Sequence, residues 1–497
     1  MNEAYRRLME RVREIGCLQS IGALLDWDQE TQMPREGVTV RARQSALMAG
    51  LAHERLTDPQ LRRLLDEADA GSDPVAETNL RETRRVVERA VKLPNKLVRR
   101  IAETSSKAKE VWADARARSD FNAFAPMLGT LIDLKREVAD RIGYETEPYD
   151  ALMDEYEPGM RAAVVETIFN QLRDGIAALL PPLMEATRKP DPSILRRRFP
   201  EDRQRAVCRR LAESIGFDFR AGRLDVSTHP FCTTIGGAGD VRITTRYNES
   251  FLPSALFGVL HEAGHALYEQ GLPREHVFTP AGEAVSLGIH ESQSRLWENF
   301  VGRSRWFWEH HYESLQQTFP ESLGDVSLDA FHAAVNTVTP SLIRVEADEL
   351  TYNLHIVLRF EIERSLIRGT LRVEDVPAAW NEGMEKTLGI RPERDAEGCL
   401  QDIHWSMGAF GYFPTYALGN LYAAQFFAQA RKEIPDLPQR IAENDHAPLR
   451  EWLREKIHRH GQRHRAAELV ERVTGKPLST EPFLRYVREK FSDIYGL

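Results

Sequence analysis

The sequence predicts a mainly α-helical fold with one small β element, organised as a single domain over residues 1–497. Apolar residues recur at intervals of three and four along most of the chain, which is the period of a helix packed on one face. Only one stretch, near residue 230, is rich in the β-branched residues and glycines typical of paired strands. No internal repeat or low-complexity linker marks a domain boundary.

Helical patterns dominate both halves of the chain. The first covers residues 4–25, with apolar side chains at Tyr5, Leu8, Met9, Val12, Ile15, Leu18 and Ile21. We expect further helices over 126–142, 160–180, 283–298 and 343–366. The charged stretch from Arg81 to Arg118 keeps the same spacing. We therefore interpret its charges as solvated helix faces rather than as a site for an anionic partner.

The β element consists of two predicted strands, Leu224 to Ile235 and Val241 to Tyr247, which the glycine-rich segment 236–239 separates. This pattern predicts a β-hairpin. In the second strand Asp240, Arg242 and Thr244 alternate with apolar residues, so one face is expected to be polar. Such a strand could bind an extended peptide by strand addition, or it could be an ordinary half-exposed strand.

Composition limits the possible functions. The chain is 42% hydrophobic and 28% charged, which is enough apolar material for a substantial core. A net charge of -9 argues against a general nucleic-acid-binding protein. The four cysteines are scattered and form no CxxC pair, and the charged N-terminus has no apolar signal segment. No run of about 18 apolar residues occurs, so we expect a soluble cytoplasmic protein with reduced thiols.

The segment Leu260 to Ala266 carries the clearest chemistry. His261 and His265 are four residues apart, so on a helix they project from one face and could bind a single metal ion. Glu262 lies at the rim of that face, where it could take a proton from a metal-bound water. Pro253 before the motif and Gly271 after it are typical of the ends of a helix.

A catalytic zinc site usually has three protein ligands, so a further ligand is expected from another element. The predicted helix 283–298 offers Glu283, His290, Glu291 and Glu298. His290 and Glu291 point about 100° apart on a helix, so only one of them is expected to face the metal. Arg295 lies four residues after Glu291 and could support it as an ion pair. Spacing alone slightly favours Glu291.

Several separate motifs follow one another along the chain. They are His229-Pro230-Phe231; Asp240, Arg242 and Thr244; His261-Glu262 with His265; His290-Glu291 with Arg295; Ile343-Arg344 with Asp348; Gln401-Asp402 with His404-Trp405; and Phe413-Pro414-Thr415-Tyr416 with Asn420. In this order they resemble the thermostable carboxypeptidase Taq family of zinc metallocarboxypeptidases (peptidase family M32) over nearly the whole chain. No position that carries chemistry departs from the pattern.

The resemblance implies that Glu291 completes the metal site with His261 and His265, and that one zinc, or alternatively cobalt, binds per chain. It implies a large clefted helical metallopeptidase of the gluzincin type with a small β-sheet beside the active-site helix. The N-terminal helices, roughly residues 1–120, would form a lid over the cleft. The chain would be a homodimer that binds neither nucleic acid nor membrane and removes single residues from peptides with a free C-terminus, with broad specificity.

The same resemblance suggests roles for other residues. Glu262 would be the general base, and Tyr416 would stabilise the oxyanion. Arg344 would bind the terminal carboxylate of the substrate, although an ordinary helix ion pair with Asp348 is the competing interpretation. Three further residues are candidates: His229 and Arg242 for substrate contact, and His404 for substrate or transition-state support.

Two other functions share this ligand set. A zinc endo-oligopeptidase on a similar helical scaffold would keep His261, Glu262, His265 and Glu291 but would need no cation for a terminal carboxylate. A non-catalytic helical scaffold braced by its metal would retain every measurable function after Glu262→Gln. A structural site of that kind normally closes its fourth position with another protein ligand.

Overall fold

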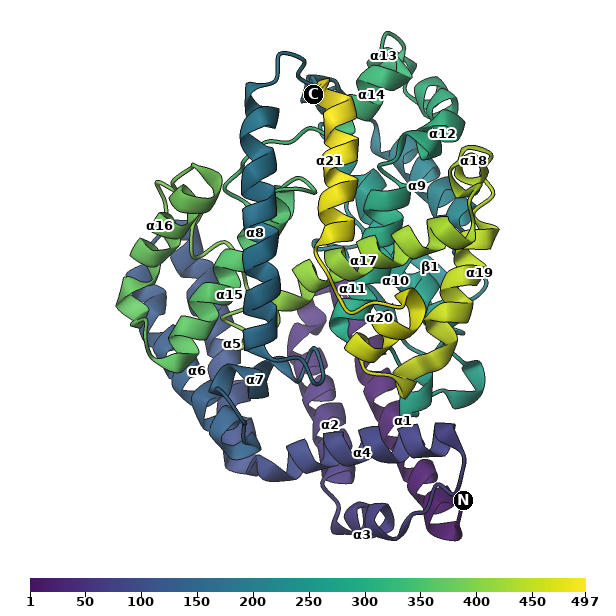
Figure 1. Cartoon of the computed structure of the whole chain (residues 1–497). Helices are drawn as coiled ribbons and strands as arrows, with labels where there is room; N and C mark the ends of the chain where they lie inside the picture. The colour runs from purple at the N-terminus through teal and green to yellow at the C-terminus, as the bar shows by residue number, and fades with distance from the viewer.

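The computed structural model describes residues 1–497 and confirms the mainly helical fold (Figure 1). The N-terminal half consists of nine helices, which are α1 (Glu3–Thr31), α2 (Val38–Leu56), α3 (Pro59–Glu67), α4 (Pro74–Lys92), α5 (Asn95–Arg118), α6 (Phe121–Ile142), α7 (Pro148–Met153), α8 (Ala162–Glu185) and α9 (Glu201–Ile215). None of the helices in the chain combines the length and the apolar character that a membrane crossing requires.

The C-terminal half of the chain begins after a short β-sheet. Its helices are α10 (Pro253–Gly271), α11 (Leu287–Arg295), α12 (Arg305–Thr318), α13 (Pro320–Leu323), α14 (Leu328–Val335), α15 (Tyr352–Arg368), α16 (Val376–Leu388), α17 (Pro414–Glu433), α18 (Leu437–Ala442), α19 (Ala447–Lys456), α20 (Ala466–Thr474) and α21 (Glu481–Tyr495). A π-helical turn, Leu296–Val301, extends α11. Short 3₁₀ turns occupy Arg35–Gly37, Pro192–Arg196, Arg274–His276, Pro280–Gly282, Arg344–Glu346, Val373–Asp375 and His458–Arg463.

Helix α6 shows how local sequence determines these elements. Asp120 precedes the helix and accepts a hydrogen bond from the Ala123 N–H, which satisfies one of the free donors of the first turn. Phe121, Phe124 and Leu128 then recur at three- and four-residue intervals and are all buried. The helix therefore presents one continuous apolar face to the core.

The sheet differs from the predicted hairpin. It has three strands, β1 (Gly222–Val226), β2 (Cys232–Thr234) and β3 (Val241–Thr245), in the order β1-β3-β2. Strand β1 is parallel to β3, and only β2 and β3 form the antiparallel pair that was predicted. The predicted first strand is interrupted because the Ser227 hydroxyl bonds both the His229 carbonyl and the Thr244 hydroxyl, which folds the chain back before β2 begins.

Strand β3 lies between β1 and β2, so both of its edges are paired. The prediction that this strand could take an extended peptide by strand addition is therefore wrong. Its predicted polar face is only partly exposed: Thr244 is fully buried, and its hydroxyl accepts a hydrogen bond from the Phe231 N–H.

Two predicted helices begin later than expected. Helix α11 starts at Leu287 rather than at Glu283, because Ser286 is extended and its hydroxyl caps the Ile289 N–H. Helix α15 starts at Tyr352 rather than at Ile343. The Asp348 carboxylate accepts the backbone N–H groups of Leu350 and Thr351, so the chain turns at this point instead of continuing as a helix.

The N-terminal helices have a small core of their own, formed by Tyr5, Leu8, Met9, Ile15, Leu61, Leu64, Leu65, Ala76 and Val87. The main core is separate and extends from Leu97 to Tyr495. Polar contacts join the two parts: Arg81 donates to the carbonyls of Gln462 and Arg463, and the Ala281 N–H donates to Asn79. A lid role for the N-terminal helices stays a prediction.

Two buried carboxylates anchor the segments around the centre of the fold. Glu157 accepts hydrogen bonds from the Gly288 N–H at the start of α11 and from the Tyr422 hydroxyl of α17. Glu363 accepts from the Trp405 indole and from the Gly411 N–H. Burial raises the pKa of each carboxyl to about 7.

We expect the Glu157→Gln variant to gain stability relative to the wild type as the pH rises. A raised carboxyl pKa means that the folded protein binds more protons than the unfolded chain, so wild-type stability falls between about pH 4.5 and 7. The amide of the variant has no such titration and can still accept from Gly288 while it donates to Tyr422. The difference in unfolding free energy should therefore shift towards the variant by about 2–3 kcal/mol between pH 5 and 8, as measured by urea denaturation.

Glu363→Gln is the matched control for this experiment. The Trp405 N–H contacts one oxygen, and the Gly411 N–H and the Tyr149 hydroxyl contact the other. In either orientation the amide NH2, which cannot accept, would therefore face an N–H donor. This variant should lose about 1–3 kcal/mol already at pH 5. If the two variants showed the same change in unfolding free energy relative to the wild type at pH 5 and 8, the assignment of these hydrogen bonds would be contradicted.

Candidate active site

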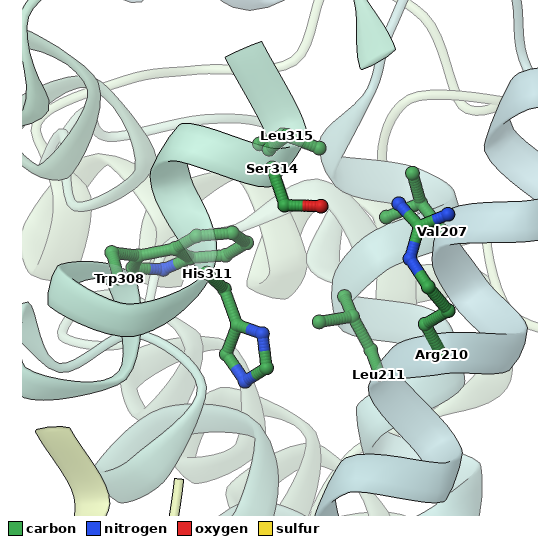
Figure 2. Close-up of a pocket in the computed structure, with 7 residues that line it drawn as sticks. All are labelled: Val207, Arg210, Leu211, Trp308, His311, Ser314 and Leu315. Carbon is green, nitrogen blue, oxygen red and sulfur yellow. The ribbon is translucent and has the colours of Figure 1, made fainter. Parts of the chain in front are cut away.

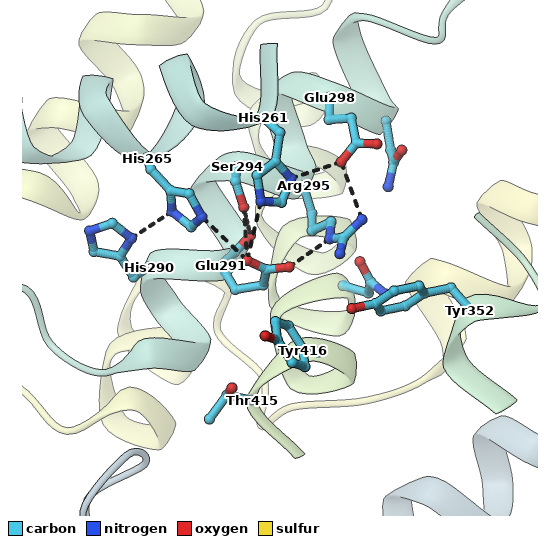
Figure 3. Close-up of polar contacts among 12 residues, drawn as sticks. His261, His265, His290, Glu291, Ser294, Arg295, Glu298, Tyr352, Thr415 and Tyr416 are labelled. Atoms are coloured by element: carbon cyan, nitrogen blue, oxygen red, sulfur yellow. Dashed lines mark hydrogen bonds and ion pairs between the residues drawn. The ribbon is translucent and has the colours of Figure 1, made fainter. Parts of the chain in front are cut away.

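Helix α10 places both predicted histidines on one face, as their spacing requires. Figure 3 shows the His261 and His265 rings turned towards the Glu291 carboxylate of α11. Glu291 Oε2 lies 3.7 Å from His261 Nε2 and 3.4 Å from His265 Nε2. One ligand atom from each residue lies within 4.8 Å of the others. Of the four candidates on the predicted helix 283–298, the structure brings Glu291 to the two histidines.

Glycines allow the three helices of this site to meet. A Cβ on Gly264 of α10 would lie 2.7 Å from the Gln293 carbonyl of α11, and a Cβ on Gly419 of α17 would lie 2.5 Å from Glu291 Cγ. Real Cβ contacts are never this short, so larger residues would push the helices apart. Gly264 therefore helps to set the position of Glu291 relative to His261 and His265.

Arginine and carboxylate groups hold the three candidate ligands in place. Arg295 donates to Glu291 Oε1 at 2.7 Å, as predicted, and to Glu298 Oε2 at 3.2 Å. Glu298 Oε2 in turn lies 2.9 Å from His261 Nδ1. Burial alone would raise the pKa of Glu291, but the neighbouring Arg295 and His261 hold it well below its ordinary value. Glu291 is thus an anion with a fixed orientation.

This donor set fits a divalent transition metal. Two imidazoles and one carboxylate are a typical set of three ligands for a catalytic zinc ion. Burial and the neighbouring His290 lower the pKa of His265 to about 3, so this ring is neutral, as a ligand must be. Each histidine also uses its Nδ1 in a hydrogen bond, which leaves Nε2 for the metal.

Glu262 lies beside this cluster on α10, with only 7% of its surface exposed. Burial raises its pKa to about 7. Its carboxylate forms no hydrogen bond with another group of the chain, in contrast to Glu291 and Glu298. A buried carboxylate without a partner can exchange a proton near neutral pH.

Arg344 is buried in an ion cluster that the sequence did not predict. Its Nε and one terminal nitrogen donate to Asp402 Oδ1 at 2.9 and 2.8 Å, and the other terminal nitrogen donates to the Tyr352 hydroxyl at 3.0 Å. Arg359 donates to Asp402 Oδ2 at 2.7 Å. The competing interpretation, a helical ion pair of Arg344 with Asp348, is therefore wrong, because Asp348 caps the turn before α15.

Two arginines share one carboxylate in this cluster, so Arg344, Arg359 and Asp402 together carry a net charge of +1. An arginine has five N–H donors, and the contacts above use three of those on Arg344. The other two N–H groups of Arg344 can donate to an anion.

Tyr416 and His404 form a pair next to this positive cluster. The Tyr416 hydroxyl lies 3.1 Å from His404 Nε2, and the Arg344 guanidinium lies 5.1 Å from the centre of the Tyr416 ring. Figure 3 shows Tyr416 beside Glu291. Burial and the two arginines lower the pKa of His404 to about 4, so its ring is neutral.

The other two predicted substrate residues lie outside the cluster. His229 is exposed in the turn between β1 and β2, where only its backbone carbonyl is hydrogen-bonded. Arg242 of β3 donates to Asp240 and lies 4.3 Å above the ring of Trp27 from α1. Arg223 of β1 contacts the same ring at 4.8 Å. Arg242 therefore joins the sheet to the first helix.

Sequence reasoning missed Asp402, Arg359 and Tyr352 as parts of the site. Asp402 belongs to one of the motifs noted in the sequence, but its partners Arg344 and Arg359 are 58 and 43 residues away in the chain. Glu298 appeared only as a possible ligand, whereas in the structure it supports His261. Its spacing of seven residues from Glu291, two helical turns, was the available signal.

Two cavities lie away from this site. Figure 2 shows a hollow between α9 and α12, lined by Val207, Arg210, Leu211, Trp308, His311, Ser314 and Leu315. Its volume is about 20 Å³, which is room for roughly one water molecule. A larger cavity of about 370 Å³ lies between α4, α5 and α6. Neither is lined by a residue of the histidine–carboxylate cluster.

Comparison with known proteins identifies the family. The profile described as Carboxypeptidase Taq (M32) metallopeptidase matches residues 7–491. The thermostable carboxypeptidase 1 of Thermus thermophilus is 48% identical over 508 residues, with 99% of each chain covered. Carboxypeptidase 1 of Bacillus subtilis is 37% identical, again with 99% of each chain covered. The crystal structure of an M32 carboxypeptidase from Deinococcus radiodurans R1 has a TM-score of 0.97 and 42% identity, with 100% of both chains covered.

The profile and these relatives extend over nearly the whole chain, which confirms the resemblance noted in the sequence. The chain belongs to the carboxypeptidase Taq (M32) family of metallocarboxypeptidases and is a hydrolase.

Proposed function

We propose that the chain is a zinc-dependent carboxypeptidase that releases single residues from the free C-terminus of peptides, with broad specificity. His261, His265 and Glu291 would hold one zinc ion per chain, and their mutual distances support this assignment. Cobalt could bind the same ligands, since metal availability decides occupancy as much as affinity does. Bound metal would acidify a water molecule and polarise the scissile carbonyl.

Glu262 is the proposed general base. Its carboxylate is buried and free of hydrogen bonds, so it can accept a proton from the attacking water and pass it to the leaving amine.

Tyr416 is the proposed oxyanion donor, and His404 positions it. If the neutral His404 ring carries its proton on Nε2, that N–H donates to the Tyr416 oxygen, 3.1 Å away. The Tyr416 hydroxyl hydrogen is then free to donate to the developing oxyanion. His404 Nδ1 has no partner in the chain, which agrees with this tautomer, because an unpaired acceptor is tolerated better than an unpaired N–H.

The Arg344 cluster is the proposed site for the terminal carboxylate of the substrate. Its net charge of +1 and its two remaining N–H donors suit a carboxylate, and burial strengthens such a charged contact. Asp402 keeps the Arg344 guanidinium in a fixed orientation, which lowers the entropy cost of binding. His229 and Arg242 stay proposals for substrate contact that no distance in the structure supports.

The observation that carries the proposal is the meeting of His261, His265 and Glu291 beside the unpaired Glu262. A time course on one unblocked peptide and on its C-terminal amide, followed by mass spectrometry, tests it. We expect stepwise loss of single C-terminal residues from the free acid, at most very slow cleavage of the amide, and no cleavage after chelation until zinc is restored. Internal cuts in both peptides would instead indicate an endo-oligopeptidase. The homodimer and the cytoplasmic location stay predictions.

A further inference from the structure

His290 is next to Glu291 in the sequence but points to the opposite side of the site. Figure 3 shows it behind His265, on the side away from Glu291. His290 Nδ1 lies 2.5 Å from His265 Nδ1, and His290 Nε2 lies 2.8 Å from Glu269 Oε1. The Thr234 hydroxyl of β2 donates to the other Glu269 oxygen at 2.9 Å. His290, Glu269 and Thr234 thus form a chain of hydrogen bonds that ends on His265.

The proton positions in this chain follow from the chemistry of a metal ligand. His265 Nε2 faces Glu291 and must be unprotonated to bind a metal, so the hydrogen of this neutral ring is on Nδ1. His265 Nδ1–H therefore donates to His290 Nδ1. His290 then carries its own hydrogen on Nε2 and donates it to the Glu269 carboxylate. The two histidine bonds therefore both donate towards Glu269, and neither ring has an unused polar atom.

The two histidine ligands are therefore supported in different ways. His261 donates directly to the Glu298 carboxylate, which Arg295 and Arg303 also contact. The carboxylate on the His265 side is Glu269, and the His290 ring lies between it and His265. A carboxylate that accepts from a ligating histidine fixes its tautomer and increases its basicity. In this chain the Glu269 carboxylate acts on His265 through the polarisable ring of His290.

Packing keeps His290 in this position. Its ring lies 4.5 Å from the His265 ring and 5.4 Å from the Tyr268 ring, measured between centroids. The Tyr268 hydroxyl accepts the Val285 N–H, so the same tyrosine also secures the segment that leads into α11. The side chains of His290 and Glu269 are only 19% and 15% exposed, which limits competition from water.

We propose that His290 and Glu269 are positioning residues that hold His265 in its metal-binding tautomer and orientation. The inference rests on the proposed metal site, and it extends that site to two residues that would not touch the metal. Glu269 lies one helical turn after His265 on α10, so one helix carries both the ligand and the carboxylate that supports it.

Zinc affinity of the purified protein, measured by competition with a chromogenic chelator at fixed pH, tests the proposal without reference to activity. We expect Glu269→Gln and His290→Phe each to weaken zinc binding by roughly 10- to 100-fold. Because both residues act through one chain of bonds, the double variant should be no weaker than His290→Phe alone. Thr234→Val, at the far end of the chain, should have the smallest effect.

Glu283→Gln is the matched control. Glu283 is close enough to Glu269 for that charge to raise its pKa, although burial is the larger cause, and it takes no part in the hydrogen-bond chain. It should leave zinc affinity unchanged. Glu298→Gln removes the corresponding carboxylate behind His261 and should weaken zinc binding at least as much as Glu269→Gln.

The visible absorption spectrum of the cobalt-substituted protein separates positioning from a merely structural role. A changed ligand field in Glu269→Gln, with unfolding of the metal-free protein unaltered, would support the proposal. An unchanged spectrum and zinc affinity within about twofold of the wild type would overturn it, as would a loss confined to the stability of the metal-free protein. If the wild type itself bound no zinc, the metal site would fail and this inference with it, so the two failures are distinguishable.

Discussion

Replacing Glu262 with Gln should lower kcat/KM for peptide hydrolysis by about 10²–10⁴-fold. The amide has almost the same shape as the carboxylate but cannot take a proton from the attacking water. Glu262 forms no hydrogen bond that holds another part of the site, so the change should leave the histidines and Glu291 in place. Rates should be measured on an unblocked peptide, together with the zinc content of the variant.

Two further measurements make this expectation specific. Glu262→Asp keeps the charge but withdraws the carboxylate by one methylene, so its activity should fall between those of the wild type and Glu262→Gln. Zinc content should be unchanged in both variants, which would show that the loss is chemical. A Glu262→Gln enzyme with more than a tenth of wild-type activity would exclude Glu262 as the general base.

Local spacing was sufficient for the parts of the site that lie on one helix. His261 and His265 had to share a face of α10 wherever the helix packed, and the same spacing placed Glu262 at the rim. The third candidate ligand was not determined by spacing alone. Four side chains on the predicted helix 283–298 were candidates, and the tight glycine contacts of α10 and α17 with α11 decide which of them reaches the histidines.

The errors arose where a side chain binds the backbone or where a segment pairs with a partner elsewhere in the chain. A helical period continues through Asp348, but its carboxylate binds the next backbone N–H groups and breaks the helix there. Strand β1 pairs with β3 in parallel, which requires the chain to cross over, and alternation of residues cannot show this. Patterns within one segment report on its own conformation, whereas partners across the fold depend on packing.

In the Arg344 cluster, one residue was predicted from the sequence and its partners were not. The family resemblance predicts Arg344 as the residue for the terminal carboxylate. Its partner Asp402 is 58 residues away, and only the structure shows that Arg344 and Arg359 share this single carboxylate. A lone Arg344–Asp402 pair would be neutral, whereas the observed cluster keeps one positive charge for a substrate anion.

Arg344→Gln should lower kcat/KM for a peptide with a free C-terminus by about 10- to 150-fold, because a hydrogen bond to a charged group contributes about 1.5–3 kcal/mol. The net charge of the cluster falls from +1 to zero. Asp402 keeps Arg359 as its partner, so no buried carboxylate is left without a counter-charge and the fold should survive. Hydrolysis is measured as single-residue release by mass spectrometry, and unfolding by circular dichroism.

The substrate itself supplies the control for this variant. The C-terminal amide offers no negative charge, so its slow residual cleavage should respond little to Arg344→Gln, and the preference for the free acid should shrink. Arg344→Lys keeps the charge but cannot donate from a planar fork, so it should recover only part of the loss. If Arg344→Gln slowed acid and amide equally, its role would be to hold Asp402 and Tyr352 in place, and the terminal carboxylate would bind elsewhere.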